Sequence, residues 1–137
     1  MGIMMDANEK YKHWLEYAQY DLDSADTMYK AGRWLYVAFM CQQAIEKLCK
    51  GLYVLYVNDE VPRIHNISSI VTRFADKLPE AITDEQYRFF DSLTAFYMES
   101  RYPEFKSNLI SRLDEQIIKT LLTQSKEVFK WLQTMKP

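Results

Sequence analysis

The sequence predicts an all-helical fold, an up-and-down bundle of four long helices and one short helix. Apolar residues recur with the 3.6-residue period of amphipathic helices along nearly the whole chain, and no segment shows the strict alternation of a strand. With three glycines and four prolines in 137 residues, few positions interrupt the helices. A chain of this length forms one domain around one core. We therefore expect a single domain over residues 1–137, with its core between residues 8 and 135.

The first two helices are expected to form an antiparallel hairpin. The first spans residues near 8–30 and is ended by Gly32. The second spans residues near 34–57, and the turn between them is too short for any other arrangement. Gly51 lies inside the second helix, where a glycine usually marks a close approach of another backbone.

Three further helices are expected after a polar connector that contains a proline. A short helix covers about 66–77, and a T-x-x-Q capping signal opens the next helix over about 83–99. Pro103 is expected to break the chain. The last helix then runs from about Ser111 nearly to the end.

Charge and composition exclude several kinds of partner. The net charge is −2, with 10 basic and 15 acidic groups in residues 1–100 and 7 and 4 in residues 101–137. A duplex-DNA binder normally carries a basic patch, so we expect no duplex DNA partner. The glycines are too far apart for a phosphate-binding loop, so any phosphate must be held by side chains or by a helix N-terminus.

The cysteines and the N-terminal residues indicate a cytoplasmic protein. Cys41 and Cys49 lie eight positions apart in one expected helix, about 12 Å, and cannot form a disulfide with each other. With two histidines and no C-x-x-C pair, we expect no metal site and no cofactor. The opening MGIMMDANEK lacks the order of a signal peptide, and the apolar stretches are too short to span a membrane.

The second expected helix carries an unusual face opposite its apolar stripe, because aromatic and charged residues are mixed on it. One interpretation is a solvated face whose aromatic residues contact neighbouring helices of the same bundle, and the other is a contact surface for a second subunit or a partner. We favour the second interpretation and expect a homodimer. The residues of this face are Tyr36, Phe39, Gln43, Glu46, Lys47, Lys50 and Val54.

Asp21 is out of place within the apolar arc of the first helix. A buried carboxylate needs a partner, which predicts either a structural ion pair or helix cap, or a site carboxylate that faces Arg101 or a lysine.

Five sequence segments together resemble one known family. They are W-x3-A-x2-D-L-x2-A from Trp14, G-R-W from Gly32, C-Q-Q-A-I-E-K-L-C-K from Cys41, I-H-N-I from Ile64 and R-Y-P-E from Arg101. In this order and spacing they resemble the HEPN family, the higher eukaryotes and prokaryotes nucleotide-binding domain, over residues 11–133. The resemblance implies a commonly dimeric bundle of about five helices in a prokaryotic protein. It also implies a gene often placed beside one for a minimal nucleotidyltransferase, as a toxin–antitoxin-like pair.

The resemblance also suggests site residues, with one departure from the family pattern. Ribonuclease members carry an arginine followed, after four to six residues, by a histidine. Arg101 matches the arginine, but Lys106, Ser107 and Asn108 occupy the positions open to the histidine. Asn108 can form a hydrogen bond with a phosphate or base, yet it cannot transfer a proton as an imidazole does. The metal-independent ribonuclease reaction therefore lacks its expected histidine.

Three hypotheses follow for function. The first is a helical partner of a minimal nucleotidyltransferase that binds nucleotide or RNA phosphate. The second is a ribonuclease toxin acting across a dimer cleft with Arg101, Asn108 and either His65 or Glu104, and the third is a structural helical dimer. His65 has capping or packing as its alternative role. The candidate residues are Arg101 and Asn108 for catalysis, Arg101, Tyr102, Lys50 and Lys47 for phosphate binding, and Asp21, Glu46 and His65 in support.

Overall fold

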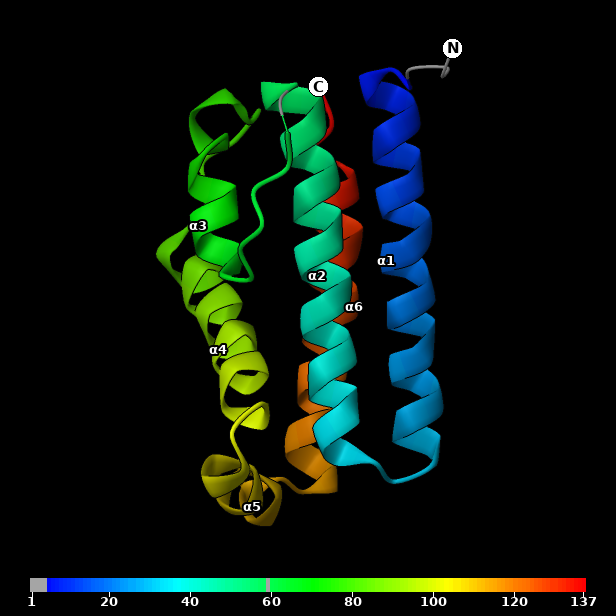
Figure 1. Ribbon diagram of the computed structural model, residues 1–137, viewed down its shortest axis with the longest axis vertical. Coiled ribbons are helices and arrows are strands. Elements are labelled where there is room, and N and C mark those ends of the chain that lie inside the picture. The colour runs from blue at the N-terminus through cyan, green and yellow to red at the C-terminus, as the bar shows by residue number, and fades with distance from the viewer. Residues whose placement is uncertain (1–4, 59) are drawn as a thin grey trace.

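The long helices of the chain run alternately down and up along a common axis (Figure 1). The structure is a computed structural model that describes residues 5–58 and 60–137. The long helices are α1 (Ala7–Lys30), α2 (Trp34–Val57), α4 (Asp84–Ser100) and α6 (Glu115–Gln133). The described residues contain no strand, so the all-helical prediction is confirmed. Residues 1–4 and residue 59 lie outside the described residues. The signal-peptide expectation rests partly on residues 1–4.

Side-chain caps fix where several helices begin. The Asp6 side chain accepts a hydrogen bond from the Glu9 amide at 2.8 Å and opens α1. The predicted capping box of α4 is confirmed, because Thr83 Oγ1 accepts from the Gln86 amide at 3.1 Å and Gln86 Oε1 accepts from the Thr83 amide at 2.8 Å. Gly32 has a φ of +72° in the turn after α1, as its place at the end of the helix predicted.

The structure contains one helix that the sequence did not predict, and the last helix begins later than predicted. The predicted break before Pro103 is confirmed, because α4 ends at Ser100, but Pro103 is also the first residue of a further helix, α5 (Pro103–Arg112), where its missing N–H and fixed φ are tolerated. Ser111 therefore belongs to α5, and α6 begins at Glu115 after its cap Asp114. The expected short helix over 66–77 is α3 (Ile67–Thr72) followed by a separate 3-10 turn.

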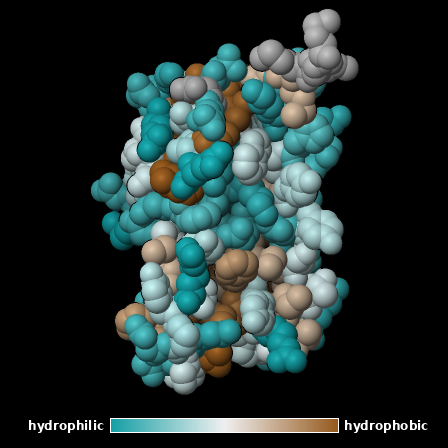
Figure 2. All heavy atoms as spheres, in the orientation of Figure 1, coloured by the Kyte–Doolittle hydropathy of each residue, from teal (hydrophilic) through white to brown (hydrophobic). Residues whose placement is uncertain are grey.

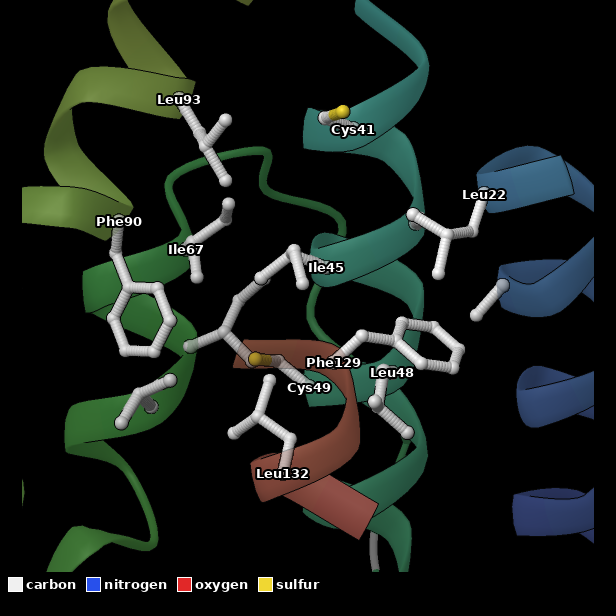
Figure 3. Packing of buried hydrophobic residues seen from close by; sticks show 14 of the residues in the cluster. Leu22, Cys41, Ile45, Leu48, Cys49, Ile67, Phe90, Leu93, Phe129 and Leu132 are labelled. Atoms are coloured by element: carbon white, nitrogen blue, oxygen red, sulfur yellow. The ribbon is translucent and has the colours of Figure 1, made fainter. Parts of the chain in front are cut away.

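Helix α2 lies at the centre of the bundle. It contacts α1, α3, α4, α5 and α6, and most of its residues are buried. In the core, Ile45 and Leu48 of α2 lie among Phe129 and Leu132 of α6, with Phe90 of α4 on the side away from α1 (Figure 3). Nearly every face of α2 is therefore covered by the same chain.

The buried cysteines belong to this core. Cys41 and Cys49 are free thiols with no exposed surface. Burial raises the pKa of the Cys41 thiol to about 11 and also raises the pKa of Cys49. Since the thiolate is the reactive form, neither residue serves as a nucleophile near neutral pH.

The predicted close approach at Gly51 is confirmed between α1 and α2. A Cβ at Gly51 would lie 3.1 Å from Trp14 Cβ and 3.1 Å from Tyr11 Cδ2. Trp14 Cβ is attached directly to the α1 backbone, so it cannot move aside without moving that helix. Glycine at this position lets the two helices approach.

We expect Gly51→Ala to lower the free energy of unfolding by about 1 kcal/mol. Alanine gains about 1 kcal/mol in helix propensity over glycine, but the close contact of its Cβ with Trp14 costs more than that gain. Urea denaturation followed by circular dichroism measures the change. Thr123→Ala, at an exposed position of α6, is the control and should leave stability nearly unchanged. A Gly51→Ala protein more stable than the wild type would contradict this account of the helix contact.

Candidate functional site

A buried carboxylate, Glu46, forms the centre of the polar interior. Glu46 lies on α2 and is 3% exposed. Its Oε1 accepts from Gln42 Nε2 at 2.8 Å, and its Oε2 accepts from Lys50 Nζ at 3.0 Å. His65 Nδ1 lies 3.1 Å from Oε1. The buried carboxylate therefore has three hydrogen-bonding partners. Two lie four residues before and after it on α2, and the third is in the connector.

His65 joins the connector to α2. The Gln42 side chain donates to the His65 carbonyl at 3.3 Å, while the His65 ring faces Glu46. The next residue, Asn66, caps α3 by accepting from the Ser69 amide at 3.0 Å. The His65 side chain is 46% exposed, so the same ring contacts both the buried carboxylate and the solvent.

One tyrosine ring brings His65 and Arg101 together. Tyr97 of α4 is buried, and its ring centre lies 4.8 Å from that of His65 and 5.7 Å from that of Phe39. The guanidinium carbon of Arg101 lies 5.5 Å from the same ring centre, and Arg101 Nη1 donates to Tyr97 Oη at 3.5 Å. Arg101 itself is exposed. We call the surface formed by His65, Tyr97 and Arg101 the Tyr97 patch.

The ring contact orients Arg101. A guanidinium over an aromatic face is attracted by about 0.5–1 kcal/mol at an exposed site. The stem of the side chain is thereby restrained, and the guanidinium has further N–H groups, besides the one that donates to Tyr97, with which to meet an anion. From the sequence, Phe39 is predicted only to lie on the mixed face of the second helix. The spacing of Tyr97 and Arg101, four residues apart on one helix, is the signal that could have linked them.

Asp21 is part of a structural ion pair. Its carboxylate accepts from Lys47 Nζ, which joins α1 to α2, and both side chains are mostly buried. The sequence predicted for Asp21 either a structural ion pair or a site carboxylate that faces Arg101 or a lysine. The contact with Lys47 is an ion pair, and Lys47 is also the lysine that Asp21 faces. Next to it, a cavity of about 390 Å³ is lined by His13, Trp14, Tyr17 and Lys47.

The mixed face of α2 is largely covered by its own chain. Glu46, Lys50 and Val54 are buried, and Phe39 stacks on Tyr97 of α4. For these residues the interpretation as contacts within the bundle is correct, and the expectation of an open contact surface is wrong, because the neighbouring elements close over α2. Tyr36 remains exposed.

Two candidates lie on or beside α5. Tyr102 is the exposed residue before Pro103, and its ring meets that of Phe105 edge-on at 6.3 Å. Asn108 is exposed on α5, and its backbone oxygen accepts from Ser111 Oγ at 2.7 Å. Within residues 5–58 and 60–137, the network around Glu46 and the Tyr97 patch does not include the Asn108 side chain.

Figure 2 shows that hydrophilic side chains predominate on the face that Figure 1 presents, with apolar atoms visible between them. Among the described residues, no group of three or more His, Cys, Asp or Glu side chains could hold a metal ion. No helix in this part of the chain combines the length and the apolar character needed to cross a membrane.

Fold and site together define a small helical domain that presents an arginine and a histidine around one tyrosine ring. A family model for the HEPN domain matches residues 11–135. The chain therefore belongs to the HEPN family, and it is a helical domain of the nucleotide-binding and ribonuclease type. Comparison with curated proteins gives no match, and comparison with solved structures gives none either.

The Glu46–Lys50 pair yields a test of stability. We expect Glu46→Leu to cost about 3–5 kcal/mol of unfolding free energy, since Lys50 is left as a buried charge without its carboxylate. The double variant Glu46→Leu with Lys50→Met should recover most of this loss, because two apolar side chains then replace the pair. Urea denaturation of the two variants checks it, and equal stabilities for the single and double variants would contradict it.

Proposed function

We propose that this HEPN-domain protein binds the phosphate of a nucleotide or of RNA at Arg101. We further propose that it forms homodimers in a prokaryotic cytoplasm and is the helical partner of a minimal nucleotidyltransferase in a toxin–antitoxin-like module. The observation that carries the proposal is the exposed guanidinium of Arg101, held over the Tyr97 ring beside His65. A planar guanidinium can donate two parallel hydrogen bonds to a phosphate.

The distribution of cations supports a phosphate site at this end of the bundle. Lys47 and Lys50 are engaged by Asp21 and Glu46, so in the proposal they hold those carboxylates in place. Lys106 of α5 lies with its Nζ 6.0 Å from the ring centre of exposed Tyr36. Arg101, the C-cap residue of α4, and Lys106 of α5 are both cations at the junction of these helices, which suits an anionic ligand, while Arg112 of α5 pairs with Glu99 of α4 at 3.5 Å.

Exposed aromatic rings accompany these cations. Tyr102 and Tyr36 are each about half exposed. Bases of single-stranded RNA stack on such rings without strong sequence preference, by about 1–3 kcal/mol per base. Tyr102 directly follows Arg101 in the chain, so a base bound there would adjoin a phosphate at the guanidinium.

We expect Arg101→Ala to weaken binding of a single-stranded RNA oligonucleotide by roughly 10-fold or more, because a charged hydrogen bond to phosphate contributes about 1.5–3 kcal/mol. Fluorescence anisotropy at two salt concentrations measures it, and the salt dependence should also decrease. Arg88→Ala, an exposed arginine of α4, is the matched control. Equal RNA affinity of the Arg101→Ala variant and the wild type would contradict the proposed site. A wild type that does not bind RNA, and whose melting temperature no nucleotide raises, would favour the purely structural dimer.

An apolar surface supports the proposed association with other proteins. Large apolar side chains are exposed around α5, at Met98, Phe105, Ile110 and Ile117. Beside them, a groove of about 320 Å³ runs between α4, α5 and α6 and is lined by Phe96, Leu109, Leu113 and Ile117 among others. Clusters of exposed apolar side chains commonly mark interfaces.

We expect light scattering at micromolar concentration to give twice the mass of the 16.4 kDa chain. Phe105→Asp should reduce it to that of the monomer, because a charge would be buried in the interface. Tyr20→Asp, at an exposed position of α1, should not. A monomeric wild type would contradict the dimer. Failure to co-purify with a co-expressed nucleotidyltransferase from the adjacent gene would contradict the proposed partner.

A further inference from the structure

A cavity at one end of the bundle is separate from the Tyr97 patch. It has a volume of about 290 Å³ and lies where the turn between α1 and α2 meets α5. Figure 1 shows that turn and α5 at the same end of the molecule. Residues 32–36 line one side, and Lys106, Ile110 and Leu113 line the other. Two segments far apart in the chain therefore form one cavity, to which no residue of the Tyr97 patch contributes.

The cavity carries two cations that have no carboxylate partner. Arg33 and Lys106 both line it. Within residues 5–58 and 60–137, neither side chain forms an ion pair, whereas Lys47 and Lys50 of α2 each hold a carboxylate. Lys106 Nζ lies 6.0 Å from the ring centre of Tyr36, which attracts it toward this wall of the cavity. Two unpaired cations on one small cavity favour an anion there.

Carboxylates close to the cavity in sequence are engaged elsewhere or point to other surfaces. Asp114 accepts from a backbone amide of α6 at 2.8 Å as the cap of that helix. Glu115 accepts from Tyr29 Oη at 3.2 Å. Neither of them lines the cavity, and neither does Glu104 of α5. The charge of the two cations is therefore left for an external anion.

The remaining walls of the cavity are apolar and contain flat rings. They consist of the side chains of Leu35, Ile110, Leu113, Trp34 and Tyr36. The Trp34 ring is held in place by Tyr29, whose ring centre lies 5.5 Å away. A ring of a ligand can stack or pack edge-on against such side chains. The cavity thus combines a cationic part with an apolar, aromatic part.

The lining distinguishes between kinds of anion. Apart from the two cations, only the Trp34 indole N–H and the Tyr36 hydroxyl are polar among the described side chains that line the cavity. This lining offers no side-chain amide or carboxylate to pair with the hydrogen-bonding edges of a nucleobase. Burying such an edge without partners is unfavourable. A hydrocarbon ring therefore fits this lining better than a base does.

We propose that this cavity binds a small organic anion, in which a carboxylate or a phosphate ester is attached to one hydrocarbon ring. Arg33 and Lys106 bind the charged group, and the ring lies against Trp34 and the aliphatic wall. A volume of about 290 Å³ is at the lower end of the range for small-molecule sites. The inference goes beyond the proposed function, since it involves neither Arg101 nor RNA.

The test uses the full chain labelled with nitrogen-15 and titrated with phenyl phosphate or with phenylacetate. The chain has three tryptophans, of which only Trp34 lines the cavity, so the indole N–H signals of Trp14 and Trp131 are internal controls. We expect a saturable shift of the Trp34 signal alone, with a dissociation constant of about 1 mM or tighter. Trp34→Phe assigns the signal by removing it. The anion that binds more tightly identifies the charged group.

Substitutions separate recognition of charge from apolar contact. Arg33→Gln and Lys106→Gln should each weaken binding of the anion by about 10-fold, because each removes a charged hydrogen bond. Lys119→Gln, at an exposed position of α6, is the matched control and should bind like the wild type. The neutral compound 2-phenylethanol keeps the ring, lacks the charge and should bind about 10-fold more weakly or less. Arg101→Ala should bind the anion like the wild type.

The opposite results would overturn the inference. They are an unmoved Trp34 signal at millimolar concentrations of both anions, equal affinity for 2-phenylethanol, or unchanged affinity in Arg33→Gln or Lys106→Gln. Adenosine monophosphate that shifts the Trp34 signal at lower concentration than phenyl phosphate would contradict the preference for a hydrocarbon ring. Loss of anion binding in Arg101→Ala would place the anion at Arg101 instead. Anion binding at Trp34 by a protein that binds no RNA would support this inference and contradict only the proposed function.

Discussion

The buried carboxylate of Glu46 is the constraint on which the rest of the site depends. Helix α2 is contacted by all five other α-helices, so a charge on it must find its partners inside the chain. Gln42 and Lys50 come from one turn on either side of Glu46, and the third partner, His65, comes from the connector. Because the carboxylate requires these donors, the connector is fixed against α2 at His65.

The position of Arg101 follows from that attachment. With His65 in place, Asn66 caps α3, and the Ile67 amide donates to Thr94 Oγ1 of α4 at 3.3 Å. One turn further along α4, the Tyr97 ring lies against His65, and Arg101 lies over that ring at the end of the helix. A continuous series of contacts thus leads from the buried charge of α2 to the exposed guanidinium.

Local signals in the sequence predict the fold better than they predict the site. Helical periodicity, Gly32 and the Thr83 capping box depend on neighbours in sequence, and the structure agrees with each of them. The break at Pro103 was predicted, but helix α5 was not, because a proline that cannot continue one helix can begin the next. Helical spacing places Lys50 on the mixed aromatic and charged face of α2. The connector packs against this face at His65, and no periodicity in the sequence specifies the path of the connector. The contact between His65 and Tyr97 could not be predicted for the same reason, since it also depends on the path of the connector.

Ion pairing inside the bundle decides where an anion can bind. Lys47 and Lys50 of α2 are candidates for phosphate binding from the sequence. To bind a phosphate, each would first have to break its ion pair with a carboxylate that is mostly buried. Arg101 requires no such exchange, because its contact with Tyr97 involves the ring and the hydroxyl and leaves the guanidinium exposed. Neither described glycine forms a phosphate-binding loop, since Gly32 lies in a turn and Gly51 is covered by α1. In the proposed function, a phosphate would therefore bind at the junction of α4 and α5 without displacing a carboxylate from Lys47 or Lys50.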